Sequence, residues 1–168
     1  MKYLLGIGTN LGDKRENIDW CINAINLAPY TDVLKRSGIY ETEPVGYARQ
    51  DNFLNCVLLV ESQFEPAEML GLCIGIECGR GRKRGIVNGP RVLDIDLLYA
   101  EDKRINTRNL TVPHPRIKER RFVIAPLMDL YPDGVAFGFN FAKNVNNIEG
   151  QLVTKIEEAE NYFADMHR

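Results

Sequence analysis

Two aspartates, Asp94 and Asp96, interrupt the otherwise apolar run at 92–99. Alternate residues of an extended strand share a face, so the two carboxylates should point the same way, about 7 Å apart at their roots. Large apolar neighbours favour a central strand, where two like charges need a cation to offset desolvation and repulsion. An edge strand with its polar face in water would show the same alternation. We expect a divalent-metal site, with oxygen ligands that favour Mg²⁺ over Zn²⁺.

The segment immediately before this pair, residues 80–91, contains five basic residues and no acidic one. The planar guanidinium of arginine suits bidentate phosphate contacts, and carboxylates with Mg²⁺ beside arginines stabilise the charge of phosphoryl transfer. The alternatives are a solvated basic loop and a loop that contacts RNA. Taken together, the two neighbouring features favour an Mg²⁺-dependent enzyme that acts on a phosphorylated substrate.

Two familiar nucleotide-binding signatures do not fit the chain. Residues 6–12 follow an expected strand and precede an expected helix, but their glycines are spaced G-x-G-x-x-x-G, which is not the dinucleotide fingerprint. We interpret these glycines as turn and close-packing residues. The sequence contains no G-x-x-x-x-G-K-[ST] motif, so the chain is not a P-loop enzyme.

A binding site for a flat ring is suggested by Phe53 and Asn55, which would share one strand face. They offer a stacking surface beside an amide with both donors and acceptors. Phe53 alone is more typical of a core position, whereas Asn55 in an apolar strand needs polar partners. His114 stands between two prolines, and we interpret it as a loop histidine rather than an acid or base.

The composition is that of an ordinary globular protein, with 45% hydrophobic and 26% charged residues in 168. We expect one domain over residues 1–168. The formal net charge of -2 argues against a protein that coats nucleic acid or a membrane. No stretch has the length of a signal-peptide core or a membrane span, so we expect a cytoplasmic protein. Four cysteines without C-x-x-C spacing should be buried reduced thiols; they are Cys21, Cys56, Cys73 and Cys78.

The elements that must position these residues follow from the hydrophobic periodicity. Strands are expected near 3–9, 33–40, 53–60 and 92–99, and helices near 14–28 and 66–79. The second helix should turn Ile74 toward the core, with Glu77 on the same face. The order β-α-β-β-α-β predicts an α+β fold of the ferredoxin-like type, a four-stranded antiparallel sheet with two helices on one face. Beyond it we expect a C-terminal extension, with a helical stretch near 116–130 and an amphipathic segment near 148–164.

Several motifs in order along residues 1–130 resemble the 6-hydroxymethyl-7,8-dihydropterin pyrophosphokinase family of folate biosynthesis. The motifs, by residue number, are 8–12 with Asp13, 40–46 with 53–55, 89–98, and 112–116. The third, Gly-Pro-Arg-Val-Leu-Asp-Ile-Asp-Leu-Leu, is specific. The resemblance implies transfer of the β,γ-pyrophosphoryl unit of ATP to the pterin hydroxymethyl oxygen, with release of AMP and with two Mg²⁺ ions.

The resemblance also implies roles for particular residues. Asp94 and Asp96 would hold both metal ions, while Arg82 and Arg91 would engage the phosphates and stabilise the transition state. Further positions match family residues around ATP: Glu77, Arg84, Leu97, His114 and Arg120. Others match residues around the pterin: the backbone of Thr42, Pro44 and Val45, the amide of Asn55, and the stacking faces of Phe53 and Phe122.

Loops 43–52 and 81–91 carry glycine and polar residues, and we expect them to close over ATP and exclude water. Asn88 stands where the family commonly has tryptophan, Val87 where a basic residue is usual, and Ile74 and Asn109 replace frequent ATP contacts. The main rival is a non-enzymatic module, because RNA-recognition and ligand-sensing domains share the element order. A second rival is a kinase that transfers one phosphoryl group. The substrates would be ATP and the pterin, and the protein a monomer or weak oligomer.

Overall fold

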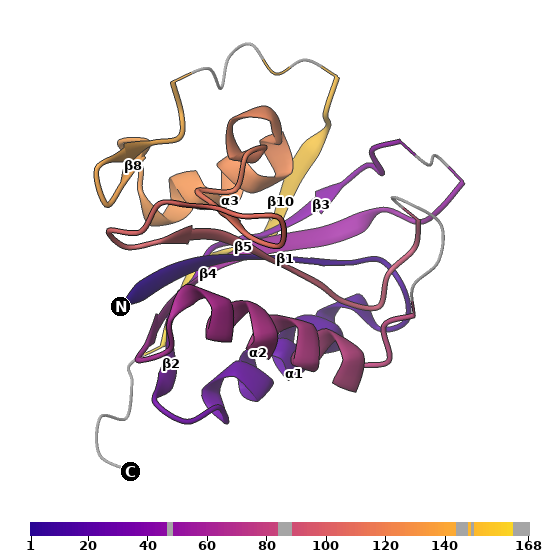
Figure 1. Ribbon diagram of the computed structural model, residues 1–168. Coiled ribbons are helices and arrows are strands. Elements are labelled where there is room, and N and C mark those ends of the chain that lie inside the picture. The colour runs from indigo at the N-terminus through magenta and orange to yellow at the C-terminus, as the bar shows by residue number, and fades with distance from the viewer. Residues whose placement is uncertain (47–48, 84–88, 144–147, 149, 163–168) are drawn as a thin grey trace.

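The computed structural model describes residues 1–46, 49–83, 89–143, 148 and 150–162. Its centre is strand β1 (Lys2–Thr9), which pairs antiparallel with β4 (Phe53–Ser62) on one side and with β5 (Asp94–Ala100) on the other. Because side chains alternate along a strand, Tyr3, Leu5 and Ile7 pack in one core cluster and Leu4 packs in the other. Figure 1 shows the sheet between the two layers of helices.

The strand expected at 33–40 is instead two strands, β2 (Thr31–Arg36) and β3 (Ile39–Thr42), which pair with opposite halves of β4. The break falls at Ser37 and Gly38. The Ser37 hydroxyl accepts a hydrogen bond from the Val57 amide at 2.8 Å and so replaces a ladder bond. A Cβ at Gly38 would lie 2.7 Å from an Asp129 carboxylate oxygen, so the chain passes too close to its neighbours for a side chain.

One face of the sheet is covered by α1 (Lys14–Asn26) and α2 (Pro66–Gly79), as the periodicity predicts (Figure 1). The Asp13 carboxylate caps α1 by accepting from the Glu16 amide at 3.0 Å. The prediction for Ile74 is wrong, because its side chain is 50% exposed, while Ile76 takes the buried position. Glu77 is buried on the core side of α2, as expected.

The opposite face is covered by α3 (Arg121–Leu130), which packs on apolar residues of β1, β4 and β5. The continuous helix expected at 116–130 is wrong at its start: η1 (Ile117–Glu119) is a separate 3-10 turn, and Arg120 between them has an extended backbone. Two short hairpins lie before and after α3 in the chain, formed by β6 (Ile105–Asn106) with β7 (Thr111–Val112) and by β8 (Val135–Ala136) with β9 (Phe139–Asn140).

The amphipathic segment near 148–164 adds two strands to the sheet. β10 (Val153–Glu157) pairs with β3, and β11 (Glu160–Asn161) pairs with β2. An α+β fold with an antiparallel sheet is confirmed, but the predicted count of four strands is wrong because the sheet has seven strands within the described residues. Sequence periodicity misses β10 and β11 because most of their side chains are exposed and show no apolar alternation.

A buried arginine attaches these C-terminal strands to β2. Arg36 is fully buried, and its Nη2 lies 2.7 Å from Glu157 Oε1 and 3.2 Å from Glu160 Oε2. Its Nη1 donates to the Ser37 carbonyl at 2.8 Å. Since the two glutamates belong to β10 and to β11, one guanidinium joins both strands to the sheet.

Cys21, Cys56 and Cys73 are buried free thiols as predicted, but the prediction for Cys78 is wrong because its side chain is exposed on α2. Among the helices in the described part of the chain, none is both long enough and apolar enough to span a membrane.

Candidate active site

A pocket forms on the α3 side of the sheet because β1 has glycine at two positions facing that side. Gly6 lies opposite Asp96, and Gly8 lies opposite both Asp94 on β5 and Asn55 on β4. Directly paired residues of neighbouring strands point to the same face, so the missing side chains leave open space between the carboxylates and the amide. A Cβ on Gly8 would lie 3.0 Å from Asn55 Oδ1.

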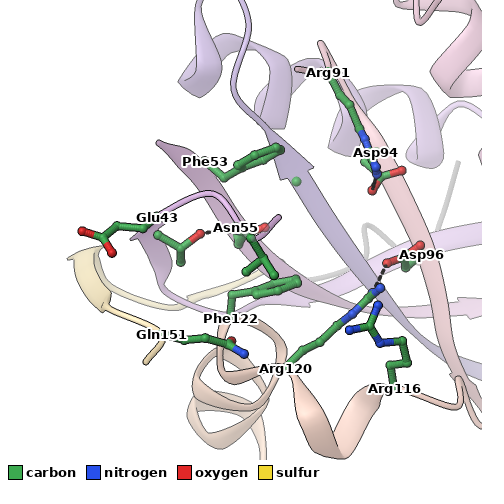
Figure 2. Close-up of a pocket in the computed structure, with 13 residues that line it drawn as sticks. Glu43, Phe53, Asn55, Arg91, Asp94, Asp96, Arg116, Arg120, Phe122 and Gln151 are labelled. Atoms are coloured by element: carbon green, nitrogen blue, oxygen red, sulfur yellow. Dashed lines mark hydrogen bonds and ion pairs between the residues drawn. The ribbon is translucent and has the colours of Figure 1, made fainter. Parts of the chain in front are cut away.

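The pocket has a volume of about 190 Å³ and is drawn in Figure 2. It joins residues from β1, β3, β4, β5 and α3, from the loops after β3 and before β5, from the turn before α3 and from the start of the C-terminal segment. Its lining residues are Gly8, Thr42, Glu43, Val45, Phe53, Asn55, Arg91, Asp94, Asp96, Arg116, Arg120, Phe122 and Gln151.

One end of the pocket contains the two aspartates with three arginines around them. Arg82 Nη1 lies 2.7 Å from Asp94 Oδ1, and Arg91 contacts the other oxygen of the same carboxylate. Arg120 Nη1 lies 3.1 Å from Asp96 Oδ2 (Figure 2). Burial, together with the charge of Asp94, raises the pKa of the Asp96 carboxyl above its ordinary value.

The expectation that 92–99 is a central strand is wrong, since β5 lies at the edge of the sheet. The aspartates nevertheless do not simply face water. The His114 amide donates to the Leu98 carbonyl at 2.8 Å, so the chain after β7 runs along this edge. Both carboxylates face the pocket. Their negative charge is offset there by neighbouring arginines.

Glu77 lies behind the aspartates and does not line the pocket. Its carboxylate accepts from the Ile95 amide at 2.6 Å and contacts Arg82. Burial raises the pKa of the Glu77 carboxyl. Because Arg82 bridges Glu77 and Asp94, α2 and β5 together set the position of this guanidinium.

The other end of the pocket offers two phenyl rings and an amide. Figure 2 shows Phe53 and Phe122 on opposite sides of Asn55. Asn55 is buried, and its Nδ2 donates to Thr42 Oγ1 at 2.6 Å, which fixes the orientation of the amide. The Arg120 guanidinium lies 5.6 Å from the Phe122 ring centre and so connects this end to the aspartates.

Asn10 connects the two loops that were expected to close over ATP. Its Nδ2 donates to Gln50 Oε1 at 2.9 Å and to the Asp51 carbonyl at 3.0 Å. Its Oδ1 accepts from the Arg91 amide at 2.8 Å. This buried side chain thus holds described parts of both loops in one arrangement.

The structure brings most of the predicted site residues to this pocket. Of the others, Leu97 is buried on the α1–α2 face, and His114 accepts from the Arg116 amide through Nδ1 at 3.2 Å. Burial lowers the pKa of His114. Pro44 and Arg82 do not line the cavity itself. Arg84, Val87 and Asn88 lie outside the described residues.

Sequence reasoning missed four pocket residues, which are Gly8, Glu43, Arg116 and Gln151. Gly8 was interpreted as a turn or packing residue, although its alternation with Gly6 in a strand could have indicated an open face. Glu43 and Arg116 belong to motifs noted in the sequence. No signal pointed to Gln151, because pairing of β10 with β3 could not be read from the chain.

No group of three or more potential ligands, counted as histidine, cysteine, aspartate or glutamate, gathers among the described residues. Two carboxylates on one face nevertheless suit Mg²⁺, which usually keeps waters and binds substrate phosphates alongside one or two protein carboxylates. The donor set at Asp94 and Asp96 therefore fits Mg²⁺ bound together with a phosphate group, and fits an all-protein metal cage poorly.

The fold and pocket define a class: a small α+β protein whose pocket places paired carboxylates among arginines beside an amide flanked by phenyl rings. Residues 4–132 match the family described as 7,8-dihydro-6-hydroxymethylpterin-pyrophosphokinase (HPPK). The chain belongs to this family, and the resemblance inferred from its motifs is confirmed.

Individual relatives agree with this assignment. The chain is 33% identical over 153 residues to the 2-amino-4-hydroxy-6-hydroxymethyldihydropteridine pyrophosphokinase of Methylorubrum extorquens, covering 91% of this chain and 97% of that protein. It is 39% identical over 126 residues to the Bacillus subtilis protein of the same name, covering 75% of each. A crystal structure of HPPK-DHPS in complex with substrates shares the fold, with a TM-score of 0.62 at 15% identity, over 88% of this chain and 44% of that one.

Proposed function

We propose that this protein transfers the pyrophosphoryl group of ATP to the hydroxymethyl oxygen of 6-hydroxymethyl-7,8-dihydropterin and releases AMP. The observation that carries the proposal is the pocket itself. It joins an amide between two phenyl rings to a cluster of two carboxylates and three arginines, in a chain that belongs to the pterin pyrophosphokinase family.

The pterin occupies the end of the pocket near Asn55 and lies between the rings of Phe53 and Phe122. The Asn55 amide offers hydrogen bonds to the ring edge, and the backbone of residues 42–45 offers more, including Thr42, Pro44 and Val45. Support comes from the 2.6 Å hydrogen bond to Thr42, which orients the amide before any ligand arrives. A preoriented polar group reduces the ordering cost of binding.

ATP occupies the end with the aspartates, where Asp94 and Asp96 would hold two Mg²⁺ ions. When bound there, the ions would supply neutralisation of phosphate charge and polarisation of the phosphorus that is attacked. Arg82 and Arg91, which contact Asp94 in the structure, are placed to exchange that contact for phosphate oxygens. The remaining ATP contacts that we propose are Glu77, Arg84, Leu97, His114 and Arg120.

In the reaction, the hydroxymethyl oxygen bonds to the β-phosphorus of ATP while the bond from that phosphorus to the oxygen of the α-phosphate breaks. AMP leaves with the electron pair, and the hydroxyl proton passes to solvent. The chain contributes positioning and charge: the arginines stabilise the phosphate oxygens, and the aromatic pair fixes the alcohol in line. A primary alcohol held in this way needs no strong dedicated base.

Incubation of the protein with ATP, Mg²⁺ and the reduced hydroxymethylpterin, followed by nucleotide separation, tests this function. We expect AMP. Formation of ADP would instead indicate a kinase that transfers one phosphoryl group, and absence of nucleotide turnover would indicate a binding module. Asp96→Ala should lower kcat at least about 100-fold. The matched control is Asp32→Ala, because Asp32 is exposed on β2 and remote from the pocket.

We propose further that the protein acts in the cytoplasm as a monomer or weak oligomer, without nucleic-acid or membrane partners. The net charge of -2 supports only the absence of nucleic-acid and membrane partners. Sedimentation at several concentrations would test the oligomeric state.

A further inference from the structure

One residue of the pocket comes from the part of the chain beyond the family match. The match ends at residue 132, whereas Gln151 lines the same pocket as Phe53, Asn55 and Phe122. In Figure 2 its side chain lies beside the start of α3, next to Phe122. A segment beyond the region that the family model matches therefore supplies part of the wall.

Strand β10 fixes where Gln151 lies. The first residue of β10, Val153, is paired with Thr42 of β3. Thr42 is in turn the hydrogen-bond acceptor that orients the Asn55 amide. Further along β10, Lys155 Nζ lies 2.8 Å from Asp129 of α3. The strand thus reaches the pocket from a position set by both β3 and α3.

The Gln151 amide makes two hydrogen bonds to the turn that begins α3. Its Oε1 accepts from the Arg121 amide at 2.9 Å, and its Nε2 donates to the Glu119 carbonyl at 3.3 Å. The N-cap residue of α3, Arg120, supplies no side-chain cap of its own. Gln151 therefore provides an acceptor that the first turn of this helix otherwise lacks.

The two hydrogen bonds are made to the residues on either side of Arg120, and Phe122 is the next residue after Arg121. Arg120 has its own contact with Asp96 at 3.1 Å, so its guanidinium has a second anchor. Phe122 has apolar packing and the Arg120 guanidinium 5.6 Å from its ring centre, but its side chain makes no ion pair of its own to the sheet. Loosening the turn should therefore disturb the stacking ring more than the phosphate end of the pocket.

We propose that Gln151 is a positioning residue for the pterin, which acts by holding the turn at 119–121 so that Phe122 faces Phe53. This inference rests on the proposed function, because it assigns the pterin to the space between the rings. A glutamine suits the role because its amide carries both the acceptor and the donor that the turn requires.

The experiment compares three variants of the full chain: Gln151→Leu, Gln151→Glu and Leu152→Ala. Gln151→Leu should raise the KM for the pterin about three- to tenfold, the effect of losing a hydrogen bond of ordinary strength. The KM for ATP and kcat should stay within about twofold. Gln151→Glu keeps the acceptor for the Arg121 amide and should recover part of the loss. Leu152, adjacent and 62% exposed, does not line the pocket, so Leu152→Ala should behave as wild type.

An unchanged pterin KM in Gln151→Leu would overturn the inference, as would an equal change in Leu152→Ala. A fall in kcat with both KM values unchanged would also overturn it. Titration of pterin fluorescence measures binding independently of the reaction, so a failure of the positioning role can be distinguished from a failure of the proposed function. Wild-type protein that binds the pterin without forming AMP would refute the proposed reaction, while weaker binding by Gln151→Leu alone would still support the positioning role.

Discussion

At the scale of single residues, the pocket depends on Gly8 of β1, because the absence of a side chain at this position leaves the pocket open. Gly8 lies opposite both Asn55 and Asp94. Even a methyl group at position 8 would lie 3.0 Å from the side-chain oxygen Oδ1 of Asn55. That separation is shorter than an ordinary carbon–oxygen contact. The amide would have to shift and so alter its bond to Thr42.

We therefore expect Gly8→Ala to weaken pterin binding about tenfold while the fold is retained. Fluorescence titration measures the binding, and circular dichroism checks the fold. The control is Gly71→Ala, since a Cβ at Gly71 meets nothing within 4 Å, and alanine favours the helix. Equal affinity of the wild type and of Gly8→Ala for the pterin would mean that Asn55 does not hydrogen-bond to it.

Single residues were also where sequence reasoning succeeded best. Asp94 and Asp96 share a face because strand alternation requires it, and the structure places both in the pocket. Their surroundings differ from the prediction, because the apolar neighbours on β5 predict a central strand and β5 lies at the edge of the sheet. Because α2 and the chain near His114 cover β5, this edge strand has the same run of apolar residues as a central strand.

At the scale of elements, the C-terminal strands are held by a buried charge. Arg36 is fully buried and pairs with Glu157 and Glu160. Arg36→Ala should lower the free energy of unfolding by about 3 kcal/mol, because it removes a buried pair and leaves a gap in the packing. Urea denaturation measures the change. Arg104→Ala, at an exposed position, should differ from wild type by less than about 0.5 kcal/mol.

The same cluster predicts how stability depends on pH. The hydrogen bond from Tyr162, together with Arg36, lowers the pKa of Glu160 below its ordinary value of 4.5. A carboxyl group with a lowered pKa in the folded state stabilises the protein above the unfolded value. That contribution is lost as the pH falls through the folded value.

Acid titration followed by circular dichroism should therefore show less loss of stability below about pH 4.5 in Glu160→Gln than in wild type. Glu158→Gln is a control on the same segment, because Glu158 is exposed and pairs with Lys155 rather than with Arg36. Identical acid profiles for wild type and Glu160→Gln would contradict the assigned role.

The elements differ in how well the sequence predicted them. α1 and α2 were predicted well because one apolar face recurs every three or four residues. The break between β2 and β3 was missed because it depends on Ser37 bonding to a distant strand and on Asp129 crowding Gly38. β10 was missed because an exposed edge strand needs no apolar pattern.

At the scale of the whole molecule, the pocket joins segments that are remote in sequence, and Asn10 bonds to two of them. We propose that loops 43–52 and 81–91 close together on ATP, and Asn10 supports this because it bonds to both Gln50 and the Arg91 amide. Hydrogen exchange should slow in both loops when ATP and Mg²⁺ bind. Asn10→Ala should retain slowing in one loop but lose it in the other.

Asn26→Ala serves as the comparison for this measurement, because Asn26 bonds to the Val33 amide at the far end of α1. Exchange rates that do not change in either loop on addition of ATP would exclude closure. The sequence could suggest two mobile loops from their glycines, but not their link, because the partners of Asn10 lie 40 and 81 positions away.

The late position of β10 in the chain has a consequence for protein synthesis. Because translation proceeds from the N-terminus, β1 to β5 and α3 leave the ribosome before the strand that carries Gln151 to the pocket. Until then the outer edge of β3 has no partner, and unpaired edges invite association with other chains. A nascent chain paused before residue 151 should therefore bind chaperones, and its release should coincide with completion of the pocket.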